Sequence, residues 1–262
     1  TGTIHSPFPE EANRRLLSPL ASLHLAPTAV SKENLVKEQI PADSIVITGN
    51  TVIDALRIAT SMPVRFTDPA LQKVVDQGRR LGVVTAHRRE SWGNPMDEAM
   101  AGLAEVAKQL PDVTFVVALH RNPVVREVIE PRLGHLENVS LTEPLSYHEF
   151  CHAMKAAEVM LTDSGGVQEE APSLGKPVLV MRESTERPEA VTAGTVELVG
   201  TDKTRIIDSL TRLLTDQSAY EEMARAVNPY GDGLASKRSI AAIEALFNVG
   251  ERMPDFDPEE SQ

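Results

Sequence analysis

The sequence predicts an α/β protein built on a doubly wound, Rossmann-like parallel sheet. Short, almost wholly apolar runs recur along the chain, as expected of strands buried on both faces of a sheet. Longer segments with helical spacing of their apolar residues separate these runs, and alternating strands and helices are typical of parallel sheets. Several apolar runs lead directly into loops rich in His, Arg, Ser and Gly. Open α/β sheets bind ligands at such loops, which follow the carboxyl ends of the strands.

The first 55 residues contain too few elements to close a domain of their own. Their patterns predict a loop over 1–9, a helix over 10–17, a strand over 23–28, a helix that Ser31 caps and that runs to Lys37, and a strand over 44–48. These elements amount to roughly two βα units. We therefore predict that residues 1–55 either are a remnant of an N-terminal Rossmann-like domain, which they complete, or extend the sheet that follows.

A fuller alternation predicts a larger, C-terminal Rossmann-like domain over residues 56–247, with a polar linker at 61–68 before its first strand. Predicted strands occupy 81–86, 113–119, 139–141, 157–161, 176–181 and 196–199. Predicted helices occupy 96–109, 123–132, 147–155, 165–174, 203–214, 218–226 and 236–247. Residues 248–262 form a tail, and its acidic, proline-containing end from Met253 is expected to fray.

Composition and charge limit the classes of partner. With 262 residues and 41% hydrophobic content, the chain is long and apolar enough to bury a core. A formal net charge of −12 and a pI near 5.1 argue against a nucleic-acid-binding surface, which needs a basic patch. Cys151 is the single cysteine, which excludes an internal disulfide and fits a reducing compartment. Without an apolar run of membrane-spanning length or a recognisable signal peptide, the expected location is cytoplasmic.

A glycine turn after one apolar run has the features of a phosphate-binding loop. The run at 157–161 leads into Ser164-Gly165-Gly166, and Asp163 or Ser164 is placed to cap a helix that starts at this turn and ends at Gly175. Adjacent glycines let the backbone approach an anion, and the first N–H groups of a helix carry partial positive charge. Glu170 follows about one and a half turns into the helix, where a carboxylate can accept hydrogen bonds from a ribose diol.

A purely structural role for this turn stays open. A Ser-Gly-Gly sequence after a strand is often only a tight turn with a good cap. The surroundings favour the ligand-binding interpretation, because another buried-strand pattern at 176–181 leads into the charged loop Arg182–Glu189. Charged loops at the ends of parallel strands are common ligand sites in α/β proteins.

Two further loops pair a histidine with an arginine at a strand end. His87 and Arg88 follow the run at 81–86, and His120 and Arg121 follow the run at 113–119. Histidine suits acid–base chemistry or an anion contact near neutral pH. Each loop alone is also compatible with a solvated polar connection, but two on neighbouring strands indicate convergence on one crevice.

Other chemistries find little support in the sequence. The histidines lack metal-ligand spacing and no cysteine pair occurs, so no metal site is predicted. A Gly-x-Ser-x-Gly nucleophile elbow and a Walker phosphate loop are also absent from the sequence. Glu10 starts the first predicted helix, where a carboxylate either complements the helix dipole or serves as a catalytic group.

Several motifs together resemble one enzyme family. The residues that carry the resemblance are Ser6-Pro7-Phe8-Pro9-Glu10-Glu11-Ala12-Asn13-Arg14, Thr48-Gly49-Asn50-Thr51-Val52-Ile53-Asp54-Ala55-Leu56, His87-Arg88-Arg89-Glu90-Ser91, Leu161 to Pro172, and Thr185-Glu186-Arg187-Pro188-Glu189-Ala190. In this order, over nearly the whole chain, they are similar to the non-hydrolysing UDP-N-acetylglucosamine 2-epimerases. The resemblance implies a GT-B architecture, a homodimer and no added redox cofactor. It also implies interconversion of UDP-N-acetylglucosamine and UDP-N-acetylmannosamine for cell-envelope polysaccharide biosynthesis.

The resemblance further implies roles for individual residues. Glu10 would be an acid/base carboxylate, and His87 would stabilise the departing UDP beside its diphosphate. The implied route is loss of the C2 proton with anti elimination of UDP to a 2-acetamidoglucal, followed by reprotonation on the other face and re-addition of UDP. The residues that would hold the substrate are Ser164, Gly165 and Gly166 at phosphate, Glu170 at ribose, Arg187 at the UDP or sugar, and Phe150 near uracil. A second, activating UDP-N-acetylglucosamine would bind at Arg88 and His120.

The family pattern and this sequence differ at the start. Family members open with an N-terminal domain that carries a Gly-Thr-Arg-Pro-Glu type turn and two further catalytic carboxylates, which this sequence does not contain. We therefore expect the 262-residue chain alone to bind UDP weakly and not to epimerise. Three alternatives stay open: a retaining GT-B glycosyltransferase, a hydrolysing epimerase, and a UDP-sugar-binding module without catalysis.

Overall fold

The computed structural model describes residues 4, 5 and 8–260, and the chain divides into two compact units. The larger unit comprises Ile58–Asn228, and the other unit combines Thr1–Arg57 with Pro229–Gln262. Of the sequence-based predictions, residues 1–3 of the expected loop, Ser6 and Pro7 of the first family motif, and the last two residues of the tail lie outside the described residues.

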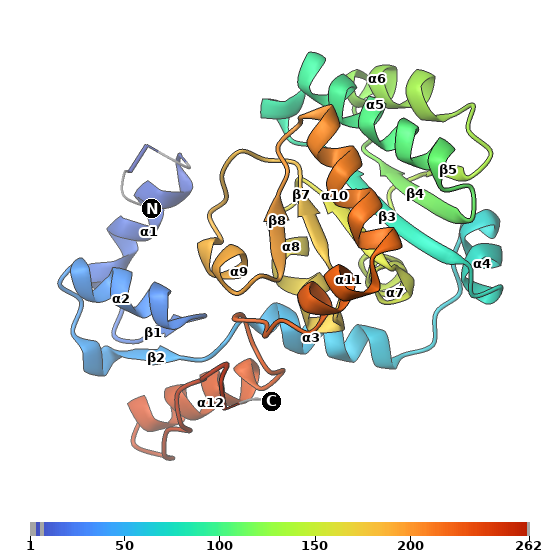
Figure 1. Cartoon of the computed structure of the whole chain (residues 1–262). Helices are drawn as coiled ribbons and strands as arrows, with labels where there is room; N and C mark the ends of the chain where they lie inside the picture. Colours follow the sequence, from blue (N-terminus) through green and yellow to red (C-terminus); the bar gives the residue numbers. More distant parts are fainter. Residues whose placement is uncertain (1–3, 6–7, 261–262) are drawn as a thin grey trace. The chain divides into compact units, whose positions relative to one another are not determined.

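A six-stranded parallel sheet forms the centre of the larger unit (Figure 1). Its strands are β3 (Arg80–Ala86), β4 (Val113–Leu119), β5 (Val139–Thr142), β6 (Val159–Thr162), β7 (Val178–Val180) and β8 (Val196–Leu198). They lie in the order β5-β4-β3-β6-β7-β8, so the chain adds strands on one side of β3 and then crosses to the other side. The strand order therefore reverses between β3 and β6, where Thr85 is paired with Thr162. This topology confirms the predicted doubly wound sheet.

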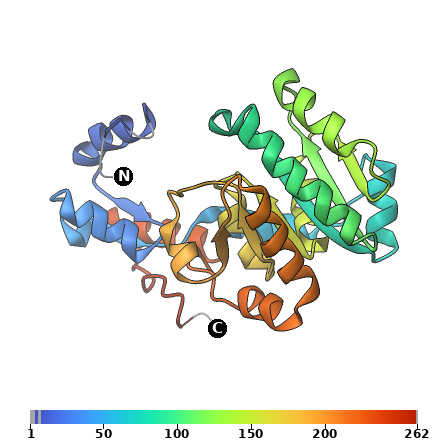
Figure 2. The same ribbon diagram turned by 45° about the horizontal axis from the view of Figure 1, so that its top comes forward.

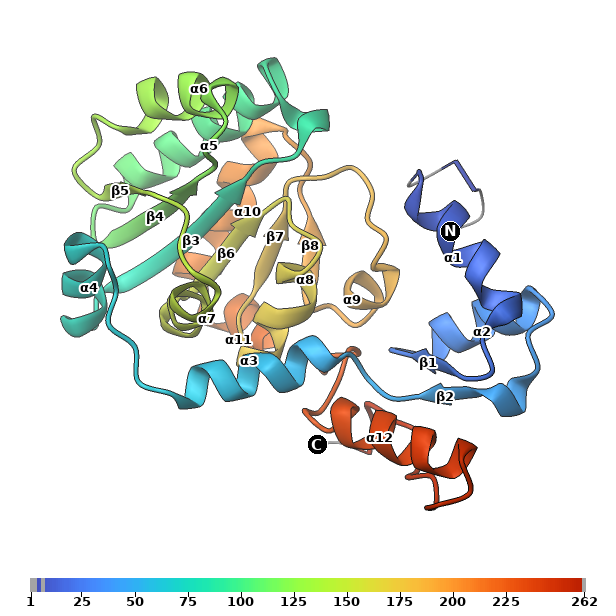
Figure 3. The ribbon, with the colours of Figure 1, turned by 180° about the vertical axis from the view of Figure 1, so that it is seen from behind.

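Helices cover both faces of this sheet. Figures 1 and 3 show α5 and α10 over one face and α7 and α8 over the other, and Figure 2 shows α5 and α10 side by side. Met100 of α5, Val117 of β4 and Leu210 of α10 are fully buried in the core between them. The helices of this unit are α4 (Pro69–Asp76), α5 (Asn94–Gln109), α6 (Pro123–Leu133), α7 (Tyr147–Ala156), α8 (Val167–Glu170), α9 (Pro188–Thr192), α10 (Lys203–Thr215) and α11 (Gln217–Ala224), with 3-10 turns at Arg89–Ser91 and Ala171–Leu174.

The other unit contains a two-stranded parallel sheet of β1 (His24–Ala26) and β2 (Ile45–Ile47). Its helices are α1 (Glu10–Leu17), α2 (Ala29–Lys37) and α12 (Ala235–Leu246), and α3 (Thr51–Ser61) runs across the boundary of the units. The predicted order of these first elements is confirmed. The predicted cap of α2 is wrong: Thr28 is the cap, and its hydroxyl accepts a hydrogen bond from Ser31 N–H at 3.1 Å because the helix begins earlier than expected.

Helix α12 and the tail belong with the first residues of the chain, whereas the sequence placed α12 in the larger domain. The carboxylate of Asp54 accepts hydrogen bonds from Ala235 N–H at 3.1 Å and Ser236 N–H at 2.9 Å, so it caps α12. The tail is anchored rather than frayed, because Phe256 N–H donates to the Ile47 carbonyl at 2.7 Å. Both contacts join residues far apart in sequence, so local patterns did not predict them.

The sequence analysis did not predict helices α3, α4 and α9. For α4 a signal was present, since Asp68 followed by Pro69 is a typical helix start. The Asp68 carboxylate accepts hydrogen bonds from Ala70 N–H at 2.7 Å and Leu71 N–H at 3.1 Å. The polar linker remains, shortened to the residues between α3 and α4.

Candidate functional site

A pocket of about 210 Å³ opens at the carboxyl ends of the central strands. The lining residues, all of the larger unit, are Thr85, Ala86, His87, Ala118, Leu119, His120, Pro144, Leu145, Phe150, Ser164 and Val167. The pocket adjoins the point where the strand order reverses, which is where doubly wound sheets bind ligands. It brings together four predicted site residues from separate segments: His87, His120, Phe150 and Ser164.

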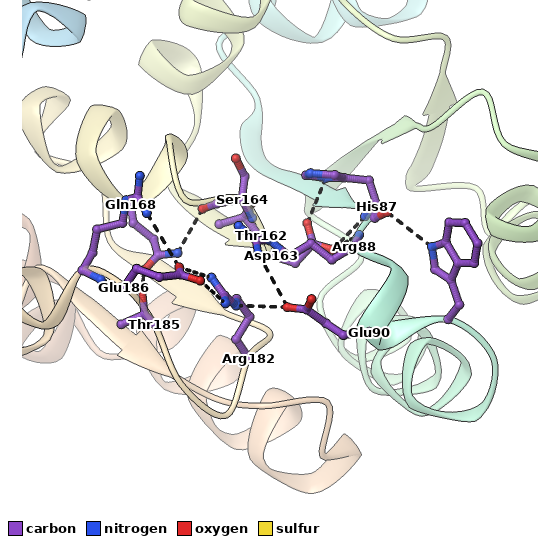
Figure 4. A network of polar contacts seen from close by, with 12 residues as sticks. His87, Arg88, Glu90, Thr162, Asp163, Ser164, Gln168, Arg182, Thr185 and Glu186 are labelled. Atoms are coloured by element: carbon purple, nitrogen blue, oxygen red, sulfur yellow. Dashed lines mark hydrogen bonds and ion pairs between the residues drawn. The ribbon is translucent and has the colours of Figure 1, made fainter. Parts of the chain in front are cut away.

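A buried carboxylate holds His87 at this point. The Asp163 side chain is 1% exposed, and its Oδ1 lies 2.9 Å from Nδ1 of His87. Its Oδ2 accepts hydrogen bonds from the backbone N–H groups of His87 at 2.7 Å and Arg88 at 2.8 Å (Figure 4). Asp163 thereby fixes both the ring of His87 and the start of the loop after β3. Because Nδ1 faces Asp163, Nε2 is the ring nitrogen left for a ligand.

The electrostatics of this pair favour an imidazolium. The hydrogen bond to Asp163 raises the pKa of His87, and burial of the ring opposes only part of this rise. For Asp163, burial works against ionisation, but the hydrogen bonds from His87 and Arg88 hold the pKa of the carboxyl below its usual range. The pair therefore favours the cationic form of the ring beside the pocket, in a protein whose net charge is −12.

The predicted capping role of Asp163 and Ser164 is wrong. Helix α8 has four residues and starts after Gly166, with no side chain capping it, and a 3-10 turn continues it. Asp163 is unavailable because its oxygens bind the loop after β3. The predicted end of the helix is confirmed, since Gly175 adopts the left-handed conformation with φ of 66°. Such a short helix carries little dipole, so anion affinity here depends on individual donors.

Those donors lie in the turn after β6. Thr162 Oγ1 accepts a hydrogen bond from Ser164 N–H at 3.0 Å and lies 2.6 Å from Thr85 Oγ1 across the strand pair. Within the described chain, the N–H groups of Gly165 and Gly166 have no hydrogen-bond acceptor. The turn thus offers two unsatisfied backbone donors beside the pocket, as a phosphate-binding turn requires.

Arg187 lies against this turn. A Cβ on Gly165 would stand 2.9 Å from Cζ of Arg187, so only glycine admits the guanidinium at this distance. Nε of Arg187 donates to Glu169 at 2.7 Å, and one terminal nitrogen lies 3.7 Å from Glu186. The structure thus brings together the predicted phosphate turn and the predicted UDP-binding arginine.

Glu170 is 6% exposed and lies beside the second glycine of the turn. Its Oε2 would be 3.6 Å from a Cβ on Gly166, and its Oε1 accepts a hydrogen bond from the Tyr147 hydroxyl at 2.8 Å. Burial raises the pKa of the Glu170 carboxyl, and the bond from Tyr147 offsets part of this rise. Tyr147 is therefore a partner of Glu170 that the sequence analysis missed.

The two residues assigned to a second ligand differ in their surroundings. The His120 ring stacks on the His87 ring with centroids 6.2 Å apart, and its Nδ1 accepts Asn122 N–H at 3.1 Å. The ring proton of neutral His120 is therefore on Nε2. Arg88 does not line the pocket; its Nε is buried without a hydrogen-bond partner among the described residues, and one terminal nitrogen of its guanidinium lies 3.6 Å from Glu90.

Glu10 lies in the other unit, where it is the exposed first residue of α1. Its neighbour Glu11 is buried, and hydrogen bonds from Arg14 and, less strongly, Arg15 lower the pKa of Glu11 to about 2. Glu11 is therefore a structural ion-pair residue, whereas Glu10 faces solvent.

Three polar residues that the sequence analysis did not assign to the site organise it: Asp163 as the partner of His87, Thr162 and Gln168. A signal for Asp163 was present, because it directly follows a buried strand at the edge where ligands bind. Thr162 and Gln168 gave no such signal, since their partners became apparent only from strand pairing and loop packing.

The part of the chain that the structure describes contains no group of three or more His, Cys, Asp or Glu side chains suited to a metal ion. In the same residues, no helix combines the length and apolar character needed to cross a membrane.

Comparison with known proteins decides the family. A family model for UDP-N-acetylglucosamine 2-epimerase matches residues 1–244. The chain belongs to this epimerase family. It is 53% identical over 253 residues to a probable UDP-N-acetylglucosamine 2-epimerase of Ralstonia nicotianae and 50% identical over 249 residues to the UDP-N-acetylglucosamine 2-epimerase of Escherichia coli K12. These matches cover 94% and 93% of this chain, and 67% and 66% of the relatives. The chain thus spans about two thirds of the length of these epimerases.

Solved structures agree with the epimerase fold. The S. aureus protein MnaA, solved with UDP, superimposes with a TM-score of 0.89 at 40% identity and covers 97% of this chain and 69% of its own. The UDP-GlcNAc 2-epimerase of Neisseria meningitidis, solved bound to UDP-GlcNAc, gives a TM-score of 0.82 at 46% identity, with 95% and 67% covered. The Rossmann-like, GT-B type of fold predicted from the sequence is confirmed.

Proposed function

We propose that this chain binds UDP-N-acetylglucosamine and takes part in its reversible C2 epimerisation to UDP-N-acetylmannosamine. The observation that carries the proposal is the His87–Asp163 pair at the strand reversal, beside the two unsatisfied N–H groups of Gly165 and Gly166. A cationic ring and paired backbone donors suit the diphosphate of a nucleotide sugar. The Neisseria relative solved with UDP-GlcNAc supports the choice of ligand.

The proposed binding mode distributes the nucleotide over the larger unit. The diphosphate contacts the Gly165 and Gly166 N–H groups, the Ser164 hydroxyl and Arg187. The ribose lies at Glu170, whose burial already removes it from bulk water. The uracil lies near Phe150, where Pro144 and Leu145 add apolar surface to the pocket. Each contact is local, which is how an acidic protein binds an anion.

The proposed chemistry requires good stabilisation of the leaving group. A base removes the C2 proton, the C1–O bond to UDP breaks, and the electron pair of the C–H bond forms the C1=C2 double bond of 2-acetamidoglucal. A proton then adds to C2 on the other face, and a UDP oxygen re-forms the bond to C1. The His87 imidazolium, held by Asp163, offsets the charge that grows on the departing diphosphate. Glu10 is proposed as an acid/base carboxylate on the family resemblance.

Two further assignments rest on the family resemblance. Arg88 and His120 are proposed to contact a second, activating UDP-N-acetylglucosamine, and the unpartnered Nε of Arg88 is compatible with an anionic ligand. The active protein is proposed to be a homodimer in the cytoplasm, and analytical ultracentrifugation of the purified protein tests the oligomeric state.

The test of the proposed function has two stages. Isothermal titration with UDP measures binding to the 262-residue chain. NMR in deuterium oxide then follows exchange of the C2 hydrogen of UDP-N-acetylglucosamine, with the purified chain and with an N-terminally extended version. Exchange in either sample with UDP-N-acetylmannosamine as the product supports the epimerase. The expectation that the 262-residue chain alone binds but does not turn over stays a prediction that the same spectra test.

Product analysis separates the alternatives. Sugar transfer to an added acceptor without exchange at C2 would identify a glycosyltransferase, and release of free N-acetylmannosamine with UDP would identify a hydrolysing epimerase. Binding of UDP with no reaction in either version would leave a binding module. Absence of UDP binding in both versions would contradict all of these assignments.

A further inference from the structure

We propose that Gln168 is a positioning residue that couples the glycine turn after β6 to the loop that carries Arg187. This inference rests on the proposed function, because it concerns how two groups proposed to bind phosphate, the glycine turn and Arg187, are held in fixed positions relative to each other. The Gln168 side chain is fully buried, and it links two loops that follow different strands.

The side-chain amide of Gln168 makes one hydrogen bond at each end (Figure 4). Its Nε2 donates to the carbonyl of Ser164 at 3.1 Å, and its Oε1 accepts from the Thr185 hydroxyl at 2.6 Å. The carbonyl of Ser164 is only an acceptor, so the NH₂ group must face it, and this sets the orientation of the amide. Gln168 thus joins the turn after β6 to the loop after β7.

Thr185 in turn contacts the backbone of Arg187, and we call the contacts from Gln168 through Thr185 to Arg187 the relay. Oγ1 of Thr185 accepts a hydrogen bond from the backbone N–H of Arg187 at 3.1 Å, while its own proton goes to Gln168. The Arg187 guanidinium returns to the turn and lies against Gly165. Gln168, Thr185 and Arg187 therefore close a ring of contacts that starts and ends at the Ser164-Gly165-Gly166 turn.

Ion pairs fix the outer side of the same loop. Arg182 binds both oxygens of Glu186 at 2.7 and 2.9 Å, and its Nε lies 3.5 Å from Glu90 of the loop after β3. Arg187 donates to Glu169, as described above. These bonds join charged side chains, whereas the Gln168 amide is a neutral link between turn and loop in the described network of Figure 4.

The chemistry of the relay requires a side chain with a donor at one end and an acceptor at the other. An ionised glutamate at this position would have acceptors only and would face the Ser164 carbonyl with negative charge. A protonated glutamate would restore the pattern, because its O–H can donate to Ser164 while the other oxygen accepts from Thr185. UDP affinity of Gln168→Glu should therefore recover as the pH falls and the glutamate becomes protonated. Gln168→Ala has no group that can restore the hydrogen bonds, so its affinity should not recover.

The experiment measures the Kd of UDP for the wild-type 262-residue chain, Gln168→Glu and Gln168→Ala at several pH values from 5.5 to 8. The ratio of each variant's Kd to that of the wild type at the same pH cancels the ionisation of UDP and of His87. We expect a ratio of about ten for Gln168→Ala at every pH, the scale of one lost buried hydrogen bond. For Gln168→Glu we expect about ten at pH 8, falling towards one at pH 5.5. Parallel, pH-independent ratios for the two variants would overturn the proposal.

Controls separate positioning from folding. Gln109→Glu adds the same charge on an exposed position of α5 and should bind UDP as the wild type does. Thr185→Val breaks the relay from its other end and keeps the test available if a Gln168 variant fails to fold, and Thr185→Ser should restore wild-type affinity. Equal Kd values for Thr185→Val and Thr185→Ser would contradict the relay.

A ligand-free measurement distinguishes failure of this inference from failure of the proposed function. Hydrogen exchange of the backbone amides at 182–187 reports whether the loop is tied to the turn. In Gln168→Ala we expect exchange there to be about tenfold faster than in the wild type, as expected for loss of one closing contact. Unchanged exchange would refute the relay even if UDP binds. A wild-type chain that does not bind UDP would refute the proposed function, and the exchange data would still decide the role of Gln168.

Discussion

The two ends of the same three strands, β3, β4 and β6, carry opposite kinds of polar cluster. At the amino ends, Arg80 donates to Glu158 at 2.9 and 2.7 Å and to Asp112 at 2.8 Å. At the carboxyl ends, His87 is held by Asp163 and stacks on His120. Both clusters join residues that only the sheet brings together.

The difference lies in what each cluster leaves unsatisfied. Arg80 is paired with two carboxylates, and its hydrogen bond to Glu158 raises its pKa further, so its positive charge is already balanced within the protein. At the other end, one buried carboxylate binds Nδ1 of His87, and the N–H groups of Gly165 and Gly166 have no acceptor in the described structure. The first arrangement stabilises the fold, whereas the second keeps donors for a ligand.

The largest effect is expected from Asp163→Asn. The amide oxygen can still accept from the backbone N–H groups of His87 and Arg88. Its NH₂ group would then face Nδ1 of His87, so the variant loses both the charge that favours the imidazolium and the hydrogen bond that holds the ring in place. We expect UDP affinity to fall about a hundredfold, the upper range for loss of a charge-assisted hydrogen bond in a binding site. Calorimetric titration measures the affinity, and circular dichroism confirms the fold. An affinity within threefold of the wild type would remove His87 from the proposed phosphate site.

A smaller loss is expected from Gly165→Ala. The added methyl group would stand 2.9 Å from Cζ of Arg187 and would displace the guanidinium from the turn. We expect about a tenfold loss of UDP affinity, equivalent to one misplaced charge-assisted contact. Gly194→Ala is the matched control, because nothing lies within 4 Å of its added Cβ, although its positive φ of 75° costs some stability. Equal UDP affinity in the two variants would show that the contact with Arg187 is irrelevant to binding.

Arg80→Ala tests the other end of the strands. The Arg80 side chain is 35% exposed, so solvent screens its ion pairs and we expect the free energy of unfolding to fall by about 1 kcal/mol. UDP affinity should stay within twofold of the wild type. Urea denaturation and titration with UDP measure the two quantities on the same preparation. Loss of UDP affinity without loss of stability would contradict the structural role assigned to Arg80 and would indicate a role in UDP binding.

The smallest effect concerns pH. The folded protein raises the pKa of His87, so the stabilisation from its charge is present below the unfolded value of about 6.5 and is lost as the pH rises through the folded pKa. We expect UDP affinity to decrease about threefold across that rise, and comparison with Asp163→Asn at the same pH separates this effect from ionisation of the terminal phosphate, whose second pKa is about 6. In Asp163→Asn the decrease should shift to lower pH. A flat profile in the wild type would exclude a role for the imidazolium in UDP binding.

The sequence predicted the elements whose signals are local. The strand at 113–119 was predicted with its observed bounds, and Gly175 was predicted to end the helix after the glycine turn. Such signals depend on burial of a short run or on the backbone conformation of one residue, so they need no information from the rest of the chain. The family motifs are similarly local, and they identified the epimerase family that the comparisons confirm.

Tertiary structure decided which of these local elements meet. Asp163 became the partner of a histidine 76 residues away because β3 and β6 pair at the strand reversal, whereas its sequence context favoured a helix cap. Gln168 and Thr185 met through the packing of two loops, and α12 joined the first unit through Asp54. The sequence therefore predicted four candidate residues that the structure brings together at one pocket, but it did not predict their partners. Pairing across long connections is determined by the strand order and packing of the whole unit, which no local pattern encodes.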